Sequence, residues 1–205
     1  MIRIVIPDSG PLMSLAKVDR LDLLDRFKCP IIVTDAVKFE VLNGSEDLPD
    51  VQTLKAWFAN AGNRIQAAET TYGQQMLQIN ELLLLIPEEE RVKQKRKYRV
   101  KDGGELSIRE LTDQIRQSST DGENILVLFE NEKVKNMSFG DHVHLMSHWS
   151  LAMAKMKIIP SAASLFDEIE KAGRTAPRNP FERQPEGADM DLQSTLDDLP
   201  RPGRE

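Results

Sequence analysis

The chain has 205 residues, of which 40% are hydrophobic and 29% are charged, and its formal net charge at pH 7 is −6. This length allows one domain of ordinary size with an extension, or two small domains. The acidic balance argues against a general basic coat for nucleic acid, although it permits a local basic segment. The single cysteine, Cys29, cannot form an internal disulfide, which is typical of a reducing compartment.

Neither a membrane span nor a signal peptide is expected. The longest apolar run, residues 82–86, is much shorter than the ~20 residues that a membrane-spanning helix needs. The first apolar run, residues 2–6, is also short and is soon followed by Asp8, whereas a signal peptide needs a longer apolar region. We therefore expect a soluble, cytoplasmic protein that does not contact a membrane.

The first half of the chain alternates between predicted strands and predicted helices. Short apolar runs indicate buried strands, and apolar residues three or four positions apart indicate helices. Thr34 or Asp35 is a natural helix N-cap, and Asn43-Gly44 is typical of a helix end. The predicted elements are a strand at 2–6, a helix that begins at Gly10-Pro11, helical periodicity over 21–27, a strand at 31–33, and helices at 37–42, 49–62 and 70–86.

The second half continues this alternation. Pro87 and the three glutamates after it look like a helix start, because acidic side chains favour the positive end of the helix dipole. Asp102-Gly103-Gly104 breaks that helix, and Ser161 is a natural cap for the last one. The predicted elements after this break are a helix over 106–115, a fully apolar strand at 125–129, a strand at 143–146, a helix through 149–153 and a helix over 162–169 that Gly173 stops.

Strands that alternate with helices predict an α/β domain with a central, mostly parallel sheet covered on both faces. We expect this domain to occupy residues 1–174. After Arg174 the composition changes, because residues 175–205 are rich in Pro, Gly, Arg, Asp and Glu and poor in apolar residues. Such a segment buries too little surface to offset its ordering entropy. It is therefore predicted to be a disordered polar tail.

Four acidic residues lie where predicted strands end or where the following helices begin: Asp8, Glu40, Glu105 and Glu130. Because the carboxyl ends of parallel strands share one edge of a sheet, these side chains are expected to converge there. Crowded carboxylates repel one another, and oxygen ligands suit Mg²⁺ or Mn²⁺, so a divalent cation would balance them. Each acid taken alone is equally explained as a solvated surface residue, and Glu105 as a favourable charge at a helix N-terminus.

Three strings resemble, in order and spacing, the acidic motifs of PIN-domain proteins: residues 7–12 (PDSGPL), 37–42 (VKFEVL) and 102–108 (DGGELSI). Many PIN-domain proteins are ribonuclease toxins of bacterial toxin–antitoxin modules, the VapC-like toxins. The resemblance covers most of residues 1–173. It implies a three-layer α/β/α fold and an endoribonuclease that depends on Mg²⁺ or Mn²⁺.

The resemblance also implies roles for individual residues and partners. Asp8, Glu40 and Glu105 match the metal-binding acids of the family, which would also be its catalytic residues. Ser9 matches a small polar residue that supports the first acid. PIN toxins commonly form homodimers and are restrained by a small antitoxin protein, so both partners are expected here.

The fourth acidic motif departs from the family pattern. The string after the apolar strand is Phe129-Glu130-Asn131-Glu132. Glu130 or Glu132 could be the fourth acid, and Asn131 could replace an aspartate of some relatives as a supporting residue. We favour Glu130 because it closes the strand directly. The number of metal ions stays open.

The segment from about residue 60 to residue 101 looks like a helical, basic insertion in this fold. Its cations could hold an RNA backbone, and its tyrosine could stack on a base. A solvated helix face that balances Glu88–Glu90 is the alternative. The candidate RNA-binding residues are Arg91, Lys93, Lys95, Arg96, Lys97, Tyr98, Arg99 and Lys101.

The leading prediction for the function is therefore a metal-dependent endoribonuclease that acts as the toxin of a toxin–antitoxin pair. The alternative is a PIN-like binding or regulatory module with weak catalysis, since the fourth motif is irregular. Cleavage of DNA is a third and weaker possibility. The sequence predicts neither the RNA target nor the cleavage site.

Overall fold

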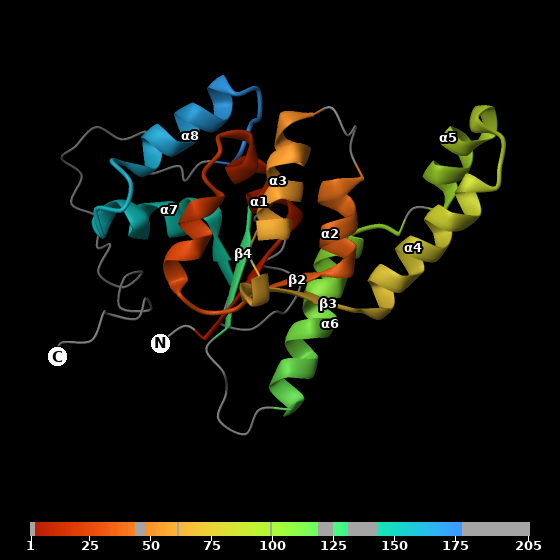
Figure 1. Ribbon diagram of the computed structural model, residues 1–205, viewed down its shortest axis with the longest axis horizontal. Helices are drawn as coiled ribbons and strands as arrows, with labels where there is room; N and C mark the ends of the chain where they lie inside the picture. Colours follow the sequence, from red (N-terminus) through yellow and green to blue (C-terminus); the bar gives the residue numbers. More distant parts are fainter. Residues whose placement is uncertain are drawn as a thin grey trace.

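The computed structural model describes residues 3–43, 48–60, 62–98, 100–118, 125–130 and 143–177. Within them, five short strands form one parallel sheet in the order β3-β2-β1-β4-β5, and helices flank this sheet in a PIN-like α/β/α arrangement (Figure 1). The predicted fold class is thus confirmed. The strands are β1 (Ile4–Pro7), β2 (Ile31–Thr34), β3 (Ile65–Ala68), β4 (Ile125–Phe129) and β5 (Val143–Leu145).

Eight α-helices and two 3₁₀ helices connect and follow these strands in the described part of the chain. Most of them agree with the sequence pattern, including the last helix, where Ser161 accepts a capping hydrogen bond from the backbone N–H of Ser164 at 3.0 Å. The α-helices are α1 (Ser9–Lys17), α2 (Asp35–Leu42), α3 (Pro49–Asn60), α4 (Thr71–Leu84), α5 (Glu88–Lys97), α6 (Gly103–Ser118), α7 (Met146–Lys155) and α8 (Ala162–Lys171), and the 3₁₀ helices are η1 (Leu21–Phe27) and η2 (Gly62–Arg64).

The central strands β1 and β4 carry the hydrophobic core. All five residues of β4 are buried, as a strand covered on both faces requires. Val5 and Ile6 of β1 are fully buried beside it, and Ile6 pairs with Val127. Beyond the end of β1, the backbone N–H of Asp8 still donates to the Leu128 carbonyl oxygen at 2.9 Å. The sheet therefore fixes the backbone of Asp8.

Two elements differ from the sequence-based prediction. Residues 65–68 were expected within an insertion, but they form β3, which pairs in parallel with β2 at the edge of the sheet. This strand was missed because it reads Ile-Gln-Ala-Ala and exposes two of its four residues. Helical periodicity over 21–27 yields a 3₁₀ helix, not a continued α-helix.

Helices α4 and α5 form a hairpin, residues 71–97, that projects from the body on the side opposite α7 and α8 (Figure 1). Of the described residues in the segment predicted as an insertion, residues 60–101, only this hairpin projects, whereas residues 65–68 belong to the sheet. The expected helix break at Gly103-Gly104 is instead the first turn of α6.

Contacts with the core continue to Ala176, which packs against it and is 8% exposed. Residues 178–205 lie outside the described residues, so the disordered tail stays a prediction. No helix in the described ranges is both long and apolar enough to cross a membrane.

Asp35 holds the α4–α5 hairpin against the body. Its Oδ1 accepts a hydrogen bond from the Thr70 hydroxyl at 2.7 Å, and its Oδ2 accepts one from the Thr70 backbone N–H at 3.1 Å. Gln74 Nε2 donates to Oδ2 at 3.3 Å. Thr70 is the N-cap of α4 and is buried. The start of α4 thus depends on a carboxylate at the start of α2.

We predict that Asp35→Ala lowers the free energy of unfolding by about 1–3 kcal/mol, because it leaves the buried donors of Thr70 without acceptors. Asp35→Asn keeps one acceptor oxygen and should lose less. Asp22→Ala is the control, since Asp22 makes only half-exposed ion pairs with arginines, which contribute little. Urea unfolding measures all three variants, and equal effects of Asp35→Ala and Asp22→Ala would contradict the role of Asp35.

Candidate functional site

Asp8 lies at the carboxyl end of the central strand β1 and is the N-cap residue of α1. Its backbone is extended, with φ −78° and ψ 169°, and its side chain forms no capping hydrogen bond. Asp8 is only 7% exposed. Its Oδ1 is buried and has no hydrogen-bond partner among the described residues. An unpartnered buried carboxylate oxygen is costly, and such groups commonly face a ligand.

The surroundings of Asp8 raise its pKa from 3.8 to about 7. Burial is the largest cause, because it penalises the charged form; the negative charges of Glu105 and Glu40 raise the pKa further. The backbone N–H groups of Ser9 and Gly10 act in the opposite direction. The structure therefore brings two other predicted acids, Glu40 and Glu105, within electrostatic reach of Asp8.

Glu40 and Glu105 reach this position because α2 and α6 approach each other closely. Gly104 is the second residue of α6 and precedes Glu105, and a Cβ atom at Gly104 would lie 2.8 Å from Oε2 of Glu40. Any larger residue would therefore push the Glu40 carboxylate away. Gly104, predicted as part of a helix break, is in fact the residue that lets the first turn of α6 approach Glu40, whereas Gly103 faces Met76 and Val100.

A pair of buried hydroxyls fixes the same approach. The Oγ1 of Thr34 and the Oγ of Ser107 lie 2.7 Å apart, and Ser107 also donates to the Gly104 carbonyl oxygen at 2.6 Å. Thr34 Oγ1 accepts from the backbone N–H of Val37 at 3.3 Å as the N-cap of α2. The sequence analysis identified Thr34 as a possible cap and missed Ser107. The only sequence signal for Ser107 was its place inside the 102–108 motif.

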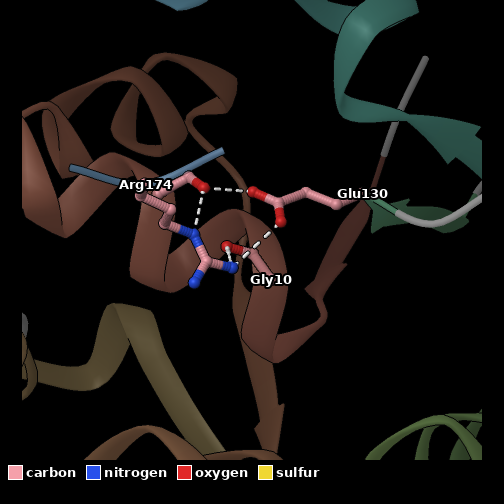
Figure 2. A network of polar contacts seen from close by, with 4 residues as sticks. Gly10, Glu130 and Arg174 are labelled. Atoms are coloured by element: carbon pink, nitrogen blue, oxygen red, sulfur yellow. Dashed lines mark hydrogen bonds and ion pairs between the residues drawn. The ribbon is translucent and has the colours of Figure 1, made fainter. Parts of the chain in front are cut away.

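Glu130 follows β4, as predicted, but its carboxylate contacts other groups. Ser14 donates a hydrogen bond to Oε1, and Arg174 Nη2 lies 3.0 Å from Oε2 (Figure 2). Both carboxylate oxygens of Glu130 thus accept from protein donors. Ser14 and Arg174 were not identified as site residues from the sequence.

The donors at Asp8 suit a hard divalent cation, although they do not form a complete metal site as they stand. Carboxylate oxygens are the ligands that Mg²⁺ and Mn²⁺ prefer, and a cation would offset the repulsion that raises the pKa of Asp8. Within the part of the chain that the structure describes, no three His, Cys, Asp or Glu side chains are grouped so that they could hold a metal ion. Asp8, Glu40 and Glu105 nevertheless have the oxygen chemistry and the negative charge that suit such an ion, and Asp8 offers an unpartnered Oδ1.

The basic residues around α5 differ in their surroundings. Arg91 donates from Nε to the Ile86 carbonyl oxygen at 2.8 Å and from Nη2 to that of Leu84 at 3.0 Å, so it ties the turn between α4 and α5. Lys97 Nζ lies 5.1 Å from the ring centroid of Tyr98. Lys93, Lys97 and Lys101 are exposed. Arg91 therefore has a structural role, whereas these lysines are accessible to a ligand.

Several predicted site residues cannot be placed. Arg99, Asn131 and Glu132 lie outside the described residues, as do the side chains of Lys95 and Arg96. Ser9, the predicted supporting residue, is half-buried at the first position of α1, and its backbone N–H acts on Asp8.

Residues 4–96 match the model of a protein family, DUF3368, that is described as a PIN domain. The match covers less than half of the chain, and the fold of the described residues is PIN-like. PIN domains are generally nucleases, which are hydrolases, and generally use divalent metals. No curated protein matches the chain.

The matched span contains Asp8, Glu40 and most of the α4–α5 hairpin, whereas Glu105 and Glu130 lie beyond it. The segment predicted as an insertion thus falls largely inside the part that matches the family. Asp8 and Glu40 thus belong to the matched region. Glu105 lies outside it in sequence, but the fold brings its charge close enough to Asp8 to raise the pKa of Asp8.

The raised pKa of Asp8 predicts an unusual pH dependence of stability without divalent cations. Because the folded pKa of about 7 exceeds the ordinary value of 3.8, the folded protein binds the proton more tightly than the unfolded chain. The free energy of unfolding therefore falls as pH rises from about 4 to about 7, by at most about 4 kcal/mol. Asp8→Asn, which stays neutral, should be more stable than the wild type at pH 8 and equally stable near pH 4.

Urea unfolding in the presence of a chelator, at several pH values, measures this difference. Asp19→Asn is a suitable control because Asp19 is exposed. A difference between wild type and Asp8→Asn that did not change with pH would contradict the raised pKa.

Proposed function

We propose that the protein is a Mg²⁺- or Mn²⁺-dependent endoribonuclease. The observation that carries this proposal is the buried Asp8, which keeps one carboxylate oxygen unpartnered within the described chain while Glu105 and Glu40 crowd it. The PIN-domain match supplies the nuclease class. Repulsion of this kind costs stability, and a bound cation would offset it.

Asp8, Glu40 and Glu105 would hold the cation. When bound, a divalent metal ion lowers the pKa of a water molecule and stabilises the negative charge that develops during phosphodiester hydrolysis. The protein's own contribution is to fix the carboxylates. The hydrogen bond from the Asp8 N–H to Leu128 holds the Asp8 backbone in place. The Thr34–Ser107 contact holds the first turns of α6, which carry Glu105.

RNA is the proposed substrate, with the exposed lysines around α5 contacting its backbone. Lys93 and Lys97 face solvent on the projecting hairpin, and Lys101 lies between that hairpin and α6. Tyr98 is 49% exposed, so its ring is accessible to a base. These features support contact with a single strand. Lys95, Arg96 and Arg99 stay in the proposal on sequence alone.

The proposal includes a role as the toxin of a toxin–antitoxin pair, restrained by a cognate antitoxin protein and forming a homodimer. These partners are supported only by the resemblance of the three acidic motifs. The competing proposal is a PIN-like regulatory module with weak catalysis, because the carboxylate of Glu130 contacts Ser14 and Arg174. Titration with Mn²⁺ distinguishes the enzyme from the regulatory module. The enzyme must bind Mn²⁺, and Asp8→Asn must remove that binding, whereas the module requires no Mn²⁺ binding.

Cleavage of RNA should depend on each of the three acids. Asp8→Asn, Glu40→Gln and Glu105→Gln are each expected to lower the rate of cleavage of a labelled single-stranded RNA at least about 100-fold, because each weakens the metal site. A chelator should abolish cleavage, and Mg²⁺ or Mn²⁺ should restore it. Glu168→Gln, an exposed position on α8, is the control with unchanged activity.

A single-stranded DNA of the same sequence tests the choice of RNA and should be cut more slowly. Expression of the wild type in a bacterial host should also inhibit growth, whereas expression of Asp8→Asn should not. Cleavage by Asp8→Asn at the wild-type rate would refute the mechanism.

The lysines of α5 should contribute to RNA affinity in a salt-dependent way. Lys93→Met and Lys97→Met on the Asp8→Asn background, which does not cleave, should each reduce the slope of log affinity against log salt by about 0.7 for single-stranded RNA. Arg91→Met should lower thermal stability instead, because it breaks the α4–α5 turn. Lys171→Met, exposed on α8, is the control. Unchanged slopes for both lysine variants would remove α5 from the RNA site.

A further inference from the structure

Arg174 comes from the end of the domain and reaches back to its first helix. It follows α8 and precedes Ala176, which packs against the core. Its Nε donates to Ser14 Oγ at 2.6 Å, and its Nη2 lies 3.4 Å from the Gly10 carbonyl oxygen. These partners are 160 and 164 residues away along the chain. The C-terminal segment is therefore joined directly to the turn that follows Asp8.

Glu130 completes this contact. Its Oε2 accepts from Arg174 Nη2 at 3.0 Å, and its Oε1 accepts from Ser14 (Figure 2). The side chain of Glu130 is only 10% exposed and that of Arg174 is 27% exposed. Ser14 is fully buried. Removal of one member of such a pair leaves the other buried and unpaired, so the contact resists opening.

Gly10 connects the Glu130–Arg174 pair with Asp8. Its carbonyl oxygen faces Arg174, and its backbone N–H faces the carboxylate of Asp8. A Cβ atom at Gly10 would lie 2.9 Å from Oε2 of Glu130, so the glycine backbone is pressed against that carboxylate. Movement of the pair would therefore shift Gly10, whose backbone N–H faces Asp8.

We propose that Glu130 and Arg174 are positioning residues, which fix the first turn of α1 and thereby the orientation of Asp8, and that Glu130 is not a metal ligand. Both oxygens of Glu130 already accept hydrogen bonds, from Ser14 and Arg174. Arg174 Nη2 lies 3.0 Å from Oε2 of Glu130, so a cation bound to this carboxylate would stand close to the positive guanidinium, which would oppose it. The metal-binding part of this inference rests on the proposed function, whereas the positioning part does not.

Replacement of Arg174 distinguishes positioning from ligation, because the two roles predict opposite effects on metal affinity. If Glu130 were a ligand, Arg174 would compete with the cation, so Arg174→Met would strengthen Mn²⁺ binding. If the pair positions Asp8, Arg174→Met weakens Mn²⁺ binding. Glu130→Gln likewise separates the roles, since loss of a ligand would equal the effect of Asp8→Asn, and loss of a positioning group would be smaller.

The positioning itself can be measured on the metal-free full-length chain by amide hydrogen exchange. The Leu12 N–H donates to the Asp8 carbonyl oxygen at 3.4 Å and closes the first turn of α1, whereas the Asp8 N–H donates to Leu128 at 2.9 Å within the sheet. In Arg174→Met, exchange at Leu12 should accelerate about tenfold while exchange at Asp8 stays unchanged, because the opening is local. Equal acceleration at both amides, or no change at Leu12, would overturn the proposal.

Two further variants complete the experiment. Arg174→Lys keeps the charge but lacks the fork that contacts Gly10, Ser14 and Glu130 together, and it replaces Arg174→Met in the same measurement if that variant does not fold. Arg26→Met removes an exposed arginine from a surface ion pair and should change neither amide.

Mn²⁺ titration of the same proteins is the second measurement. Arg174→Met should weaken binding about tenfold, since misplacement of one ligand costs affinity on the scale of outer-shell mutations. Stronger binding by Arg174→Met, or loss of binding in Glu130→Gln as complete as in Asp8→Asn, would overturn the proposal. If the wild type bound no Mn²⁺, only the proposed function would be refuted. The amide measurement would still decide whether Glu130 and Arg174 position Asp8.

Discussion

The structure is arranged around a buried carboxylate with like-charged neighbours. Asp8 stands at the end of the central strand, where burial and the charges of Glu105 and Glu40 all disfavour its ionised form. A protein gains no stability from such a cluster without a compensating charge. The fold nevertheless maintains it, through contacts that each restrict one of the three acids. Stability is given up at the carboxyl end of the central strand, which is where open α/β sheets commonly bind ligands.

The contacts that maintain the cluster come from distant parts of the chain. The parallel pairing of β1 with β4 fixes the backbone of Asp8. The hydroxyl pair of Thr34 and Ser107 joins the end of β2 to the first turns of α6, and Gly104 lets that helix approach Glu40. The hydroxyl pair is buried and its oxygen atoms lie 2.7 Å apart, so small changes in packing there would alter the position of α6 and of Glu105 on it.

Glu130 differs from a predicted metal ligand in its contacts as well as in its sequence context. Glu130 stands at the end of β4, where a fourth metal-binding acid is expected, yet its carboxylate contacts Ser14 of α1 and Arg174 beyond α8. An acid at a strand end can therefore bind a cation from outside or an arginine from its own chain. Here the same edge of the sheet places an ion pair beside the acid cluster, and this pair links the first helix to the end of the domain.

The sequence by itself determined the order of strands and helices, because apolar runs and helical spacing are local properties. It also indicated Asp8 at a strand end and Glu105 in the first turn of a helix, and it indicated Glu40, which lies in the last turn of α2, through the resemblance of residues 37–42 to a PIN-domain motif. Strand β3 escaped prediction because its four residues are partly exposed and its pairing with β2 comes from outside the segment.

Only the tertiary structure decided what each acid faces. Asp8 is buried among like charges, whereas Glu130 meets Arg174 from 44 residues further along the chain. Likewise, Arg91 looked like any other cation of a basic segment, and its hydrogen bonds to Ile86 and Leu84 exist only because α4 and α5 fold into a hairpin. Spacing along a chain places a residue on an element, but the charge and burial that set its chemistry come from elements packed against it.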